Sequence, residues 1–503
     1  MSNNSSHSYS QILKSTSLVG GSQVINILLG IVRMKILAVL LGPSGLGLIG
    51  LYNAILGILG TITNMGIGSS GVRQIAEAAA SKDNQRISLT ILTVRKVTLL
   101  FGFLGMLVMF SLCRPLSLLS FGSFKYSWAI AILSITLFLG SISGGQIALI
   151  QGLRKITYLA RLSVLGAFLG TITSIPIIFL WRENGIVPFL IAVSAMTVLT
   201  SWWYSRKIPI LIMNVPWRKT FQEAKSLLSL GFVFMTTSLM GAMVIYLIRI
   251  LVVRKFGVNG VGLYQAAITL SSIYIGVIIS AMGMDFFPRL TAAAKDNGTC
   301  NRLVNEQTEV GILIAAPGVI ATLIFTPMVL QVFYSESFLP AYDVLRWQVL
   351  GTFFRVLSWP IGYILLAKGK GRIFFFTELT ANIFHVLFVW AGISYLGLEG
   401  TGIAFFAQYL FVTIMIFIVC RRITDFLWTN NVLHILIITL CCVIVAFLLP
   451  KFASESCSIT LGIILTLLSI GYSLWKLSHL IGPECITNYS SWFKSLLKFR
   501  STK

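Results

Sequence analysis

The chain has 503 residues, of which 56% are hydrophobic and only 11% are charged, and its mean hydropathy is +0.89. Soluble proteins carry about 25% charged residues, so this composition excludes a soluble globular protein and predicts an integral membrane protein. The formal net charge is +23, which could indicate nucleic-acid binding. Most cations fall in short segments between apolar runs, however, so we interpret them as determinants of topology and expect no nucleic-acid partner.

Apolar runs of about 20 residues, the length that crosses a bilayer as a helix, follow one another along the chain. Every connection between them is short, so no soluble domain is expected. The first run is too long and carries too many internal charges for a cleavable signal. We therefore predict an all-α integral membrane protein with about fourteen transmembrane helices. Their expected ranges are 16–41, 46–68, 91–112, 127–149, 159–181, 185–204, 227–253, 261–284, 309–333, 345–366, 374–396, 401–420, 431–450 and 458–479.

Lys and Arg are distributed unequally over the connections between these helices. The positive-inside rule places the richer set of connections in the cytoplasm, and both termini then lie there as well. The tail SWFKSLLKFRSTK mixes aromatic and basic residues, and it either lies on the anionic inner leaflet or is a solvated tail. The richer set contains Arg73, Lys82, Arg86, Arg154, Lys155, Arg206, Lys207, Arg218, Lys219, Arg289, Lys295, Arg302, Lys368, Lys370, Arg372, Arg421 and Arg422.

Two stretches of the sequence share the same order of features. Residues 41–84 contain LGPSGLGLIGLYNAILG and residues 256–297 contain FGVNGVGLYQAAITL, and each stretch ends in an Arg, an alanine run and KDN. The offset is about 215 residues and covers an even number of expected helices, so both copies enter the membrane in the same direction. This predicts two six-helix lobes related by a pseudo-two-fold axis along the membrane normal.

Polar and small residues form stripes on several expected helices. Their spacing follows the helical repeat, so the members of each stripe share one face. Such a stripe either packs against another helix or lines a polar cavity, and the spacing leaves both interpretations open. The members are Gln23, Asn26, Gly30 and Arg33 in the first helix, Asn53, Gly57, Gly60, Asn64 and Gly68 in the second, and Gln265, Thr269, Ser272 and Gly276 in the eighth.

Cations inside the expected spans outnumber acids. Arg33 and Lys35 lie in the first helix, Arg249 in the seventh and Arg355 in the tenth, whereas the acids are few. A cation at bilayer depth needs a partner or a water-filled cavity, so we predict a cavity with surplus positive charge that suits an anion such as phosphate. Lys35 lies on a different face from Arg33, and it could instead snorkel or reach a neighbouring helix.

The two intramembrane acids have structural and functional interpretations. Glu378 either pairs with a buried cation such as Arg355 or takes up and releases a proton during transport. His385 lies on the same face and either shares that work or is a satisfied structural histidine. Asp285 precedes Pro288 at the cytoplasmic mouth and either forms a gate pair with Arg289 or sits at the interface.

No motif for catalysis or for a resident cofactor is present. The sequence has no ATP-binding Gly-rich loop, no paired histidines for a metal, and no nucleophile next to a base. The seven cysteines lack metal-ligand spacing. We therefore expect a non-enzymatic protein without metal or cofactor, whose energy comes from an ion gradient of protons or sodium, from the membrane potential, or from its substrate.

The sequence resembles the Wzx-type O-antigen and polysaccharide flippases. The resemblance rests on MKILAVLLGPSGLGLIGLYN, AMGMDFFPRL, LRWQVLGTFFRVLSWPIGYILLAKGKGR and FTELTANIFHVLFVW, and it covers residues 12–425. These flippases belong to a superfamily that also includes multidrug extruders and lipid II flippases. The resemblance implies two lobes around a central cavity, alternating access, and transfer of an undecaprenyl-pyrophosphate-linked oligosaccharide across the bacterial inner membrane.

The resemblance also implies roles for residues and for parts of the chain. Arg33, Arg249 and Arg355, with Lys35 less clearly, would hold the diphosphate. Asn53, Asn64 and Gln265 would contact sugar hydroxyls. Further implied partners are membrane lipids, a polysaccharide polymerase and a chain-length regulator. The expected divisions are a cytoplasmic N-terminus (1–15), an N-lobe (16–206), a linker (207–226), a C-lobe (227–423), an extra helix pair (424–480) and a basic tail (481–503).

Four alternatives remain open beside the flippase. A multidrug or cation antiporter would need an acidic cavity, which the cation surplus disfavours. A lipid II flippase of the same superfamily carries a similar extra helix pair. A non-transporting scaffold of polysaccharide assembly would not need charged residues in its spans. A membrane glycosyltransferase or ligase would need longer periplasmic loops than this chain has.

Overall fold

The computed structural model describes residues 2–481 apart from 82, 212 and 214. Side-chain surroundings are described from residue 20 onward, with the further exceptions of 219, 230, 233, 274, 277, 280–285, 455 and 481. The expected cytoplasmic tail therefore lies outside the described residues. Every regular element in the described part of the chain is helical, as the hydropathy pattern predicts.

Contacts divide the described chain into two compact units. Unit 1 contains the described residues up to Ala266 together with Leu330–Pro340, and unit 2 contains Ala267–Val329 and the described residues from Ala341 onward. The lobe boundaries expected from the sequence stay a prediction. The helices are α1 (Ser2–Asn64), α2 (Ile67–Ala80), α3 (Asn84–Ser111), α4 (Cys113–Phe121), α5 (Ser127–Gly152), α6 (Ile156–Trp181), η1 (Arg182–Gly185), α7 (Ile186–Ser205), α8 (Trp217–Ala292), α9 (Asn297–Ile324), α10 (Thr326–Phe333), η2 (Glu336–Ala341), α11 (Tyr342–Ala367), α12 (Gly371–Leu396), α13 (Glu399–Thr424), α14 (Asn430–Phe452) and α15 (Glu455–Ile481).

The chain is a multi-pass membrane protein. Among the described residues, 11 helical segments are long and apolar enough to cross a membrane. Large apolar side chains lie exposed along these segments, for example Phe103, Ile437 and Leu467. In a protein of this composition such side chains face lipid, because hydrocarbon does not penalise them.

The two sequence repeats adopt the same backbone turn. Gly42 interrupts α1 at φ 65° and ψ −170°, and Gly257 interrupts α8 at φ 67° and ψ −172°. This region of backbone space is open essentially to glycine alone. Each turn lets two helices meet at an angle within one nearly continuous helical segment, so the repeated Gly in LGPSG and FGVNG has a direct structural cause.

The two copies also contact each other reciprocally inside unit 1. A Cβ at Gly47 would overlap the carbonyl oxygen of Val258, and a Cβ at Gly262 would overlap the carbonyl oxygen of Pro43. Gly47 and Gly262 occupy equivalent repeat positions, as do Pro43 and Val258. The contact is therefore locally two-fold, like an isologous interface within one chain, and it requires glycine on both sides.

Unit 1 is a bundle in which α3 packs on α5, α6 on α7, and α1 on α6. The amphipathic α2 lies against α5 and α3 and buries Ile67 and Ile75 in an apolar cluster. Asp83 caps α3 by accepting a hydrogen bond from the backbone N–H of Gln85 at 2.8 Å. This N-cap lies in the KDN segment of the first repeat and begins the helix that corresponds to the expected span 91–112.

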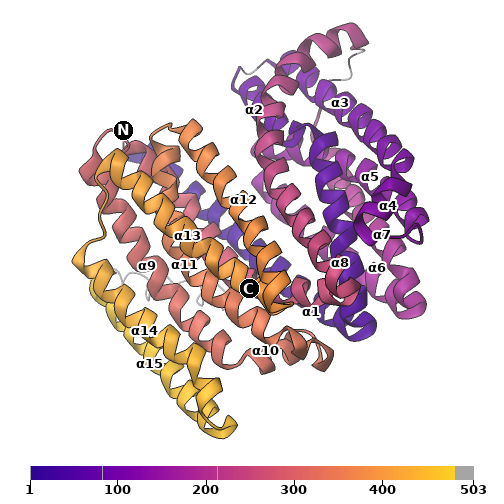
Figure 1. The fold of residues 1–503 in the computed structure, drawn as a ribbon. Coiled ribbons are helices and arrows are strands. Elements are labelled where there is room, and N and C mark those ends of the chain that lie inside the picture. Colours follow the sequence, from indigo (N-terminus) through magenta and orange to yellow (C-terminus); the bar gives the residue numbers. More distant parts are fainter. Residues whose placement is uncertain (1, 82, 212, 214, 482–503) are drawn as a thin grey trace, which may run out of the picture. The chain divides into compact units, whose positions relative to one another are not determined.

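Unit 2 is centred on α11, which packs against α13, α9 and α12. The C-terminal pair α14 and α15 lies along α9, as Figure 1 shows. Asn305 on α9 fixes the segment before α14, because its amide donates to the carbonyl of Leu427 at 3.1 Å and accepts from the N–H of Thr429 at 2.9 Å.

Arg346 joins the extra pair to the rest of unit 2. Its side chain is 1% exposed, and its guanidinium donates to the carbonyl oxygen of Phe447 on α14. It also lies 4.7 Å from the ring of Phe447 and 5.1 Å from that of Tyr342. A guanidinium enclosed by a carbonyl and two ring faces is a structural cation, and we assign it no role in ligand binding.

Candidate functional site

A polar cavity of about 420 Å³ opens inside unit 1 between α1, α2, α3, α5 and α8. We call it the Asn64 cavity. It is lined by small and polar residues, with Leu56, Phe234 and Met235 as its large apolar members. The others are Gly57, Gly60, Thr61, Asn64, Gly66, Gly68, Ser69, Thr98, Ser141, Gly144, Gly145 and Ser238.

The glycine stripe of the second expected helix creates this space. A Cβ at Gly57 or Gly68 would meet nothing within 4 Å, so these two glycines do not serve close helix packing. Asn64 is half-buried, and its side-chain oxygen accepts a hydrogen bond from Ser141 at 3.0 Å. Its amide NH₂ can then donate to a ligand, and the nearby hydroxyls can donate or accept, which suits a hydroxyl-rich molecule such as a sugar.

Arg249 and Gln265 come together within unit 1. The guanidinium of Arg249 on α8 donates to the side-chain oxygen of Gln265, which lies beyond the turn at Gly257. The Nε atom of Arg249 is buried and has no hydrogen-bond partner within the described residues. The side chain is thus oriented by one neutral partner and keeps unused donors, the arrangement that an anion would complete.

The two cations of the first helix are placed differently. Arg33 is half-buried and makes no hydrogen bond or ion pair with any residue that the structure describes. Lys35 reaches a neighbouring helix, since its ammonium donates to the carbonyl oxygen of Gln331 on α10 at 2.6 Å. Of the stripe that leads to Arg33, Asn26 bonds to Ser163 on α6 at 2.5 Å. Arg33 is therefore the more available of the two cations.

The predicted residues of unit 2 do not form one cluster. Arg355 is half-buried and lies 5.7 Å from the ring of Tyr409. Glu378 is exposed and has no ion-pair partner among the described residues, so its expected pairing with Arg355 is not present here. His385 is buried, with its ring 6.2 Å from that of Phe405. Coupling roles for Glu378 and His385 stay predictions.

Asn53, Arg289 and Asp285 are the remaining predicted site residues. Asn53 is exposed on α1, and Arg289 is exposed near the end of α8. The side chain of Asp285 lies outside the described residues, so its pairing with Arg289 stays a prediction. No cluster of metal-ligating side chains occurs in the part of the chain that the structure describes.

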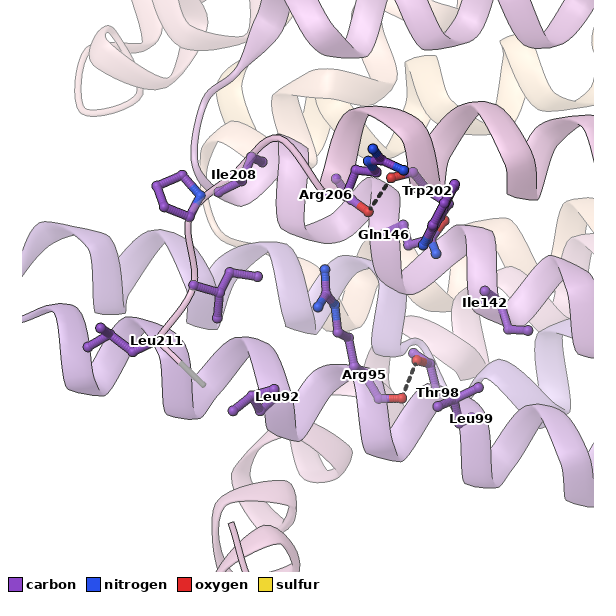
Figure 2. Close-up of a pocket in the computed structure, with 13 residues that line it drawn as sticks. Leu92, Arg95, Thr98, Leu99, Ile142, Gln146, Trp202, Arg206, Ile208 and Leu211 are labelled. Atoms are coloured by element: carbon purple, nitrogen blue, oxygen red, sulfur yellow. Dashed lines mark hydrogen bonds between the residues drawn. The ribbon is translucent and has the colours of Figure 1, made fainter. Parts of the chain in front are cut away.

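The structure adds a cation that is not among the predicted site residues. Arg95 on α3 lines a second hollow of about 580 Å³ in unit 1, together with Gln146 and Arg206 (Figure 2). Arg95 stands in the apolar run LTILTVRKVTLLFG, so the criterion that selected Arg33 also selects Arg95. Gln146 has no comparable sequence signal, because a single amide in a span is most often a packing residue.

Acidic residues do not neutralise the intramembrane cations in the described structure. The ion pairs found there include Arg73 with Glu77 and Arg302 with Glu306, and both are exposed pairs one helical turn apart. Within the described residues, neither Arg33 nor Arg249 has an acidic partner, and Arg355 has none either. Arg33, Arg249 and Arg355 thus carry positive charge that no acid among the described residues compensates.

Comparisons with known proteins agree with this architecture. The chain is 22% identical over 405 residues to the lipid III flippase of Escherichia coli (strain K12), covering 79% of this chain and 95% of that protein. It is 25% identical over 387 residues to a putative O-antigen transporter of Shigella flexneri, covering 75% and 90%.

Solved structures share the fold at low sequence identity. The lipid II flippase MurJ in an inward closed conformation superposes with a TM-score of 0.70 at 13% identity, covering 92% of this chain and 99% of that one. An inward-facing multidrug resistance MATE family transporter of the MOP superfamily gives 0.69 at 17% identity, covering 80% and 94%. Residues 36–343 match the family described as polysaccharide biosynthesis protein, more than half of the chain, and the chain therefore belongs to that family.

Proposed function

We propose that this protein is a flippase that moves an undecaprenyl-pyrophosphate-linked oligosaccharide from the cytoplasmic to the periplasmic leaflet by alternating access. The repeat unit of an O-antigen or a related surface polysaccharide is the expected cargo. The names of two relatives, a lipid III flippase and a putative O-antigen transporter, support a lipid-linked glycan as substrate. The function is transport, with no chemical step.

The observation that carries this proposal is the set of cations without acidic partners inside the membrane. Arg33 and Arg249 lie half-buried with donors to spare, and a diphosphate supplies the acceptors that they lack. A transporter of cationic drugs would need the opposite charge in its cavity. The cation surplus therefore favours a lipid diphosphate over the multidrug antiporter alternative.

The Asn64 cavity supplies the second half of the substrate site. Its hydroxyls and amide can hydrogen-bond to sugar hydroxyls, while its glycines leave room for the rings. We assign Asn64 to glycan contact and Gln265 to orienting Arg249. Asn53, Arg355 and Lys35 are further candidates, and the contact of Lys35 with Gln331 makes it the weakest.

Fourteen membrane crossings are part of this proposal. Three of the candidate segments are 45, 50 and 40 residues long, about twice the length that one crossing needs. Two of them contain the turns at Gly42 and Gly257, and the third contains η1 between α6 and α7. Crossings that double back at these three places would bring both termini to the cytoplasm, as the distribution of basic residues predicts.

The test is leaflet translocation in proteoliposomes that contain a set of undecaprenyl-pyrophosphate-linked glycans. The wild type should move at least one of them. Arg33→Ala and Arg249→Ala should each slow transport by roughly tenfold to a hundredfold, because a charge-assisted hydrogen bond is worth roughly 1.5–3 kcal/mol. Arg114→Ala removes an exposed cation of α4 and serves as the matched control, with an unchanged rate expected.

Two results would contradict different parts of this proposal. If the wild type moves none of the glycans, the flippase assignment fails. If the wild type moves one glycan and both Arg variants move it at the same rate, the assignment of the anion site is wrong. The assignment of lipid-linked glycans as substrate then stands.

A further inference from the structure

The hollow that contains Arg95 lies between α3, α5, α7 and the segment that follows α7. Its polar lining consists of Arg95, Thr98, Gln146, Ser205 and Arg206. Figure 2 shows the side chain of Arg95 extending from α3 toward the segment that carries Arg206. With a volume of about 580 Å³, the hollow is in the size range of small-molecule pockets. We call it the Arg95 pocket.

Two side chains in the Arg95 pocket, those of Arg95 and Gln146, have hydrogen-bond donors without an acceptor among the described residues, whereas the hydroxyls of Thr98 and Ser205 donate to backbone carbonyls. The guanidinium of Arg95 is half-buried and makes no hydrogen bond or ion pair with any described residue. The side-chain oxygen of Gln146 accepts a hydrogen bond from Ser201 at 2.5 Å, which turns its NH₂ group to donation. No acidic side chain lines the pocket among the described residues. A phosphate would satisfy these donors.

The mouth of the Arg95 pocket is apolar and aromatic. Leu99 is 45% exposed, Trp202 is 47% exposed and Leu211 is 48% exposed, so apolar side chains of the lining reach the surface of unit 1. Arg206 stacks 4.9 Å from the ring of Trp202. Tryptophans paired with basic residues mark the depth of the lipid headgroups, and basic pockets between transmembrane helices at that depth bind anionic headgroups.

We propose that the Arg95 pocket binds the phosphate headgroup of an anionic phospholipid from the surrounding bilayer. The phosphate would lie between the guanidinium of Arg95 and the amide of Gln146, with Arg206 at the rim. The acyl chains would follow the exposed apolar side chains at the mouth into the membrane. This ligand differs from the proposed cargo, and the pocket shares only Thr98 with the Asn64 cavity.

Lipid retention by the purified full-length protein tests the proposal without any transport measurement. Native mass spectrometry would compare micelles that contain phosphatidylglycerol with micelles that contain phosphatidylcholine of the same chain length. The wild type should retain phosphatidylglycerol preferentially, and Arg95→Gln should weaken that binding about tenfold, the value of one lost charge-assisted hydrogen bond. Gln146→Leu keeps the side-chain size and should weaken it severalfold.

Two further variants separate binding from folding. Arg86→Gln removes an exposed cation from the same helix and should bind like the wild type. Arg95→Lys keeps the positive charge without the forked donor geometry and should fall between Arg95→Gln and the wild type. If Arg95→Gln fails to fold, Arg95→Lys and Gln146→Leu still test the pocket, because each retains most of the local packing.

The outcomes that overturn the proposal are specific. Equal retention of lipid by Arg95→Gln, Gln146→Leu and the wild type excludes this pocket. Equal retention of the two phospholipids removes the preference for anionic lipid. Displacement by millimolar inorganic phosphate would identify the ligand as free phosphate, and displacement by an undecaprenyl-pyrophosphate-linked glycan would make the pocket part of the transport path.

Discussion

The two repeat copies have the same backbone conformation, but they differ in their polar side chains. Gly42 and Gly257 adopt the same turn, and Gly47 and Gly262 make the same reciprocal contact. Three positions further on, however, the first copy has Gly50 and the second has Gln265. A Cβ at Gly50 would lie 3.4 Å from the side-chain oxygen of Gln265, so the glycine of one copy makes room for the amide of the other.

This difference shows how an approximate two-fold contact can hold a polar side chain in one copy alone. Two glutamines at equivalent positions would compete for the same space near the axis. One glutamine and one glycine leave a single amide, which orients Arg249. The two copies are thus equivalent at the backbone contacts of Gly47 and Gly262, and they differ where Gln265 bonds to Arg249.

The largest expected effect comes from breaking the symmetric backbone contact. Gly47→Ala and Gly262→Ala each place a methyl group on a carbonyl oxygen that cannot move without its helix. Each should destabilise the protein by about 3 kcal/mol or more, and by similar amounts because the contacts are reciprocal. Thermal unfolding in detergent measures this. Gly57→Ala is the control, because its Cβ meets nothing within 4 Å. A small effect of either variant would mean that the copies do not touch as described.

The second expected effect concerns the turn itself. Gly42→Ala and Gly257→Ala force a side chain into a backbone region that only glycine adopts readily. Each should cost about 1–3 kcal/mol of stability. No atom lies within 4 Å of the methyl group that either substitution adds, so the loss would report backbone strain alone. If either variant has the melting temperature of the wild type, that turn does not require a glycine with positive φ.

Much of this fold follows from sequence patterns, and the reasons are physical. Hydropathy predicts the spans because the bilayer requires apolar length, and the repeat pairs Gly42 with Gly257, the two glycines that adopt the same turn. Helical spacing predicts which face of its helix carries Gly57. It does not predict whether that face packs against another helix or lines a cavity, so both alternatives stayed open. The partner of Lys35 is 296 positions away in the chain, which no local pattern reveals.

The third prediction concerns the position at which the two copies differ, Gly50 and Gln265. Gly50→Ala adds a methyl group 3.4 Å from the side-chain oxygen of Gln265, a close van der Waals contact that should restrict this side chain and disturb its hydrogen bond to Arg249, with a change in stability of less than about 1 kcal/mol. Glycan translocation in proteoliposomes should slow by roughly two- to fivefold, since one oriented hydrogen bond is worth about 1 kcal/mol. Gly276→Ala, which meets nothing within 4 Å, should transport normally. Transport at the wild-type rate by Gly50→Ala would separate Gln265 from the substrate site.

The smallest expected effect concerns Asp83 and Asp296, the helix N-caps at the ends of the two repeat copies. Asp296 accepts hydrogen bonds from the hydroxyl of Thr299 at 2.5 Å and from the backbone N–H groups of Thr299 and Gly298 at 3.1 Å. These bonds, with that of the hydroxyl first, lower the pKa of the Asp296 carboxyl below its ordinary value. Asp83 accepts from the N–H of Gln85. Asp296→Asn should therefore lower the melting temperature slightly more than Asp83→Asn does.

The pH dependence of the Asp296 cap follows from the direction of that shift. A carboxyl whose pKa is lower in the folded state contributes its stabilisation above the unfolded-state pKa, and the contribution is lost as the pH falls through the folded-state pKa. The gap in melting temperature between the wild type and Asp296→Asn should thus be constant at neutral pH and shrink below about pH 4. A gap that widens on acidification would mean that the carboxylate is not held by these bonds, because protonation would then relieve a cost rather than remove a gain.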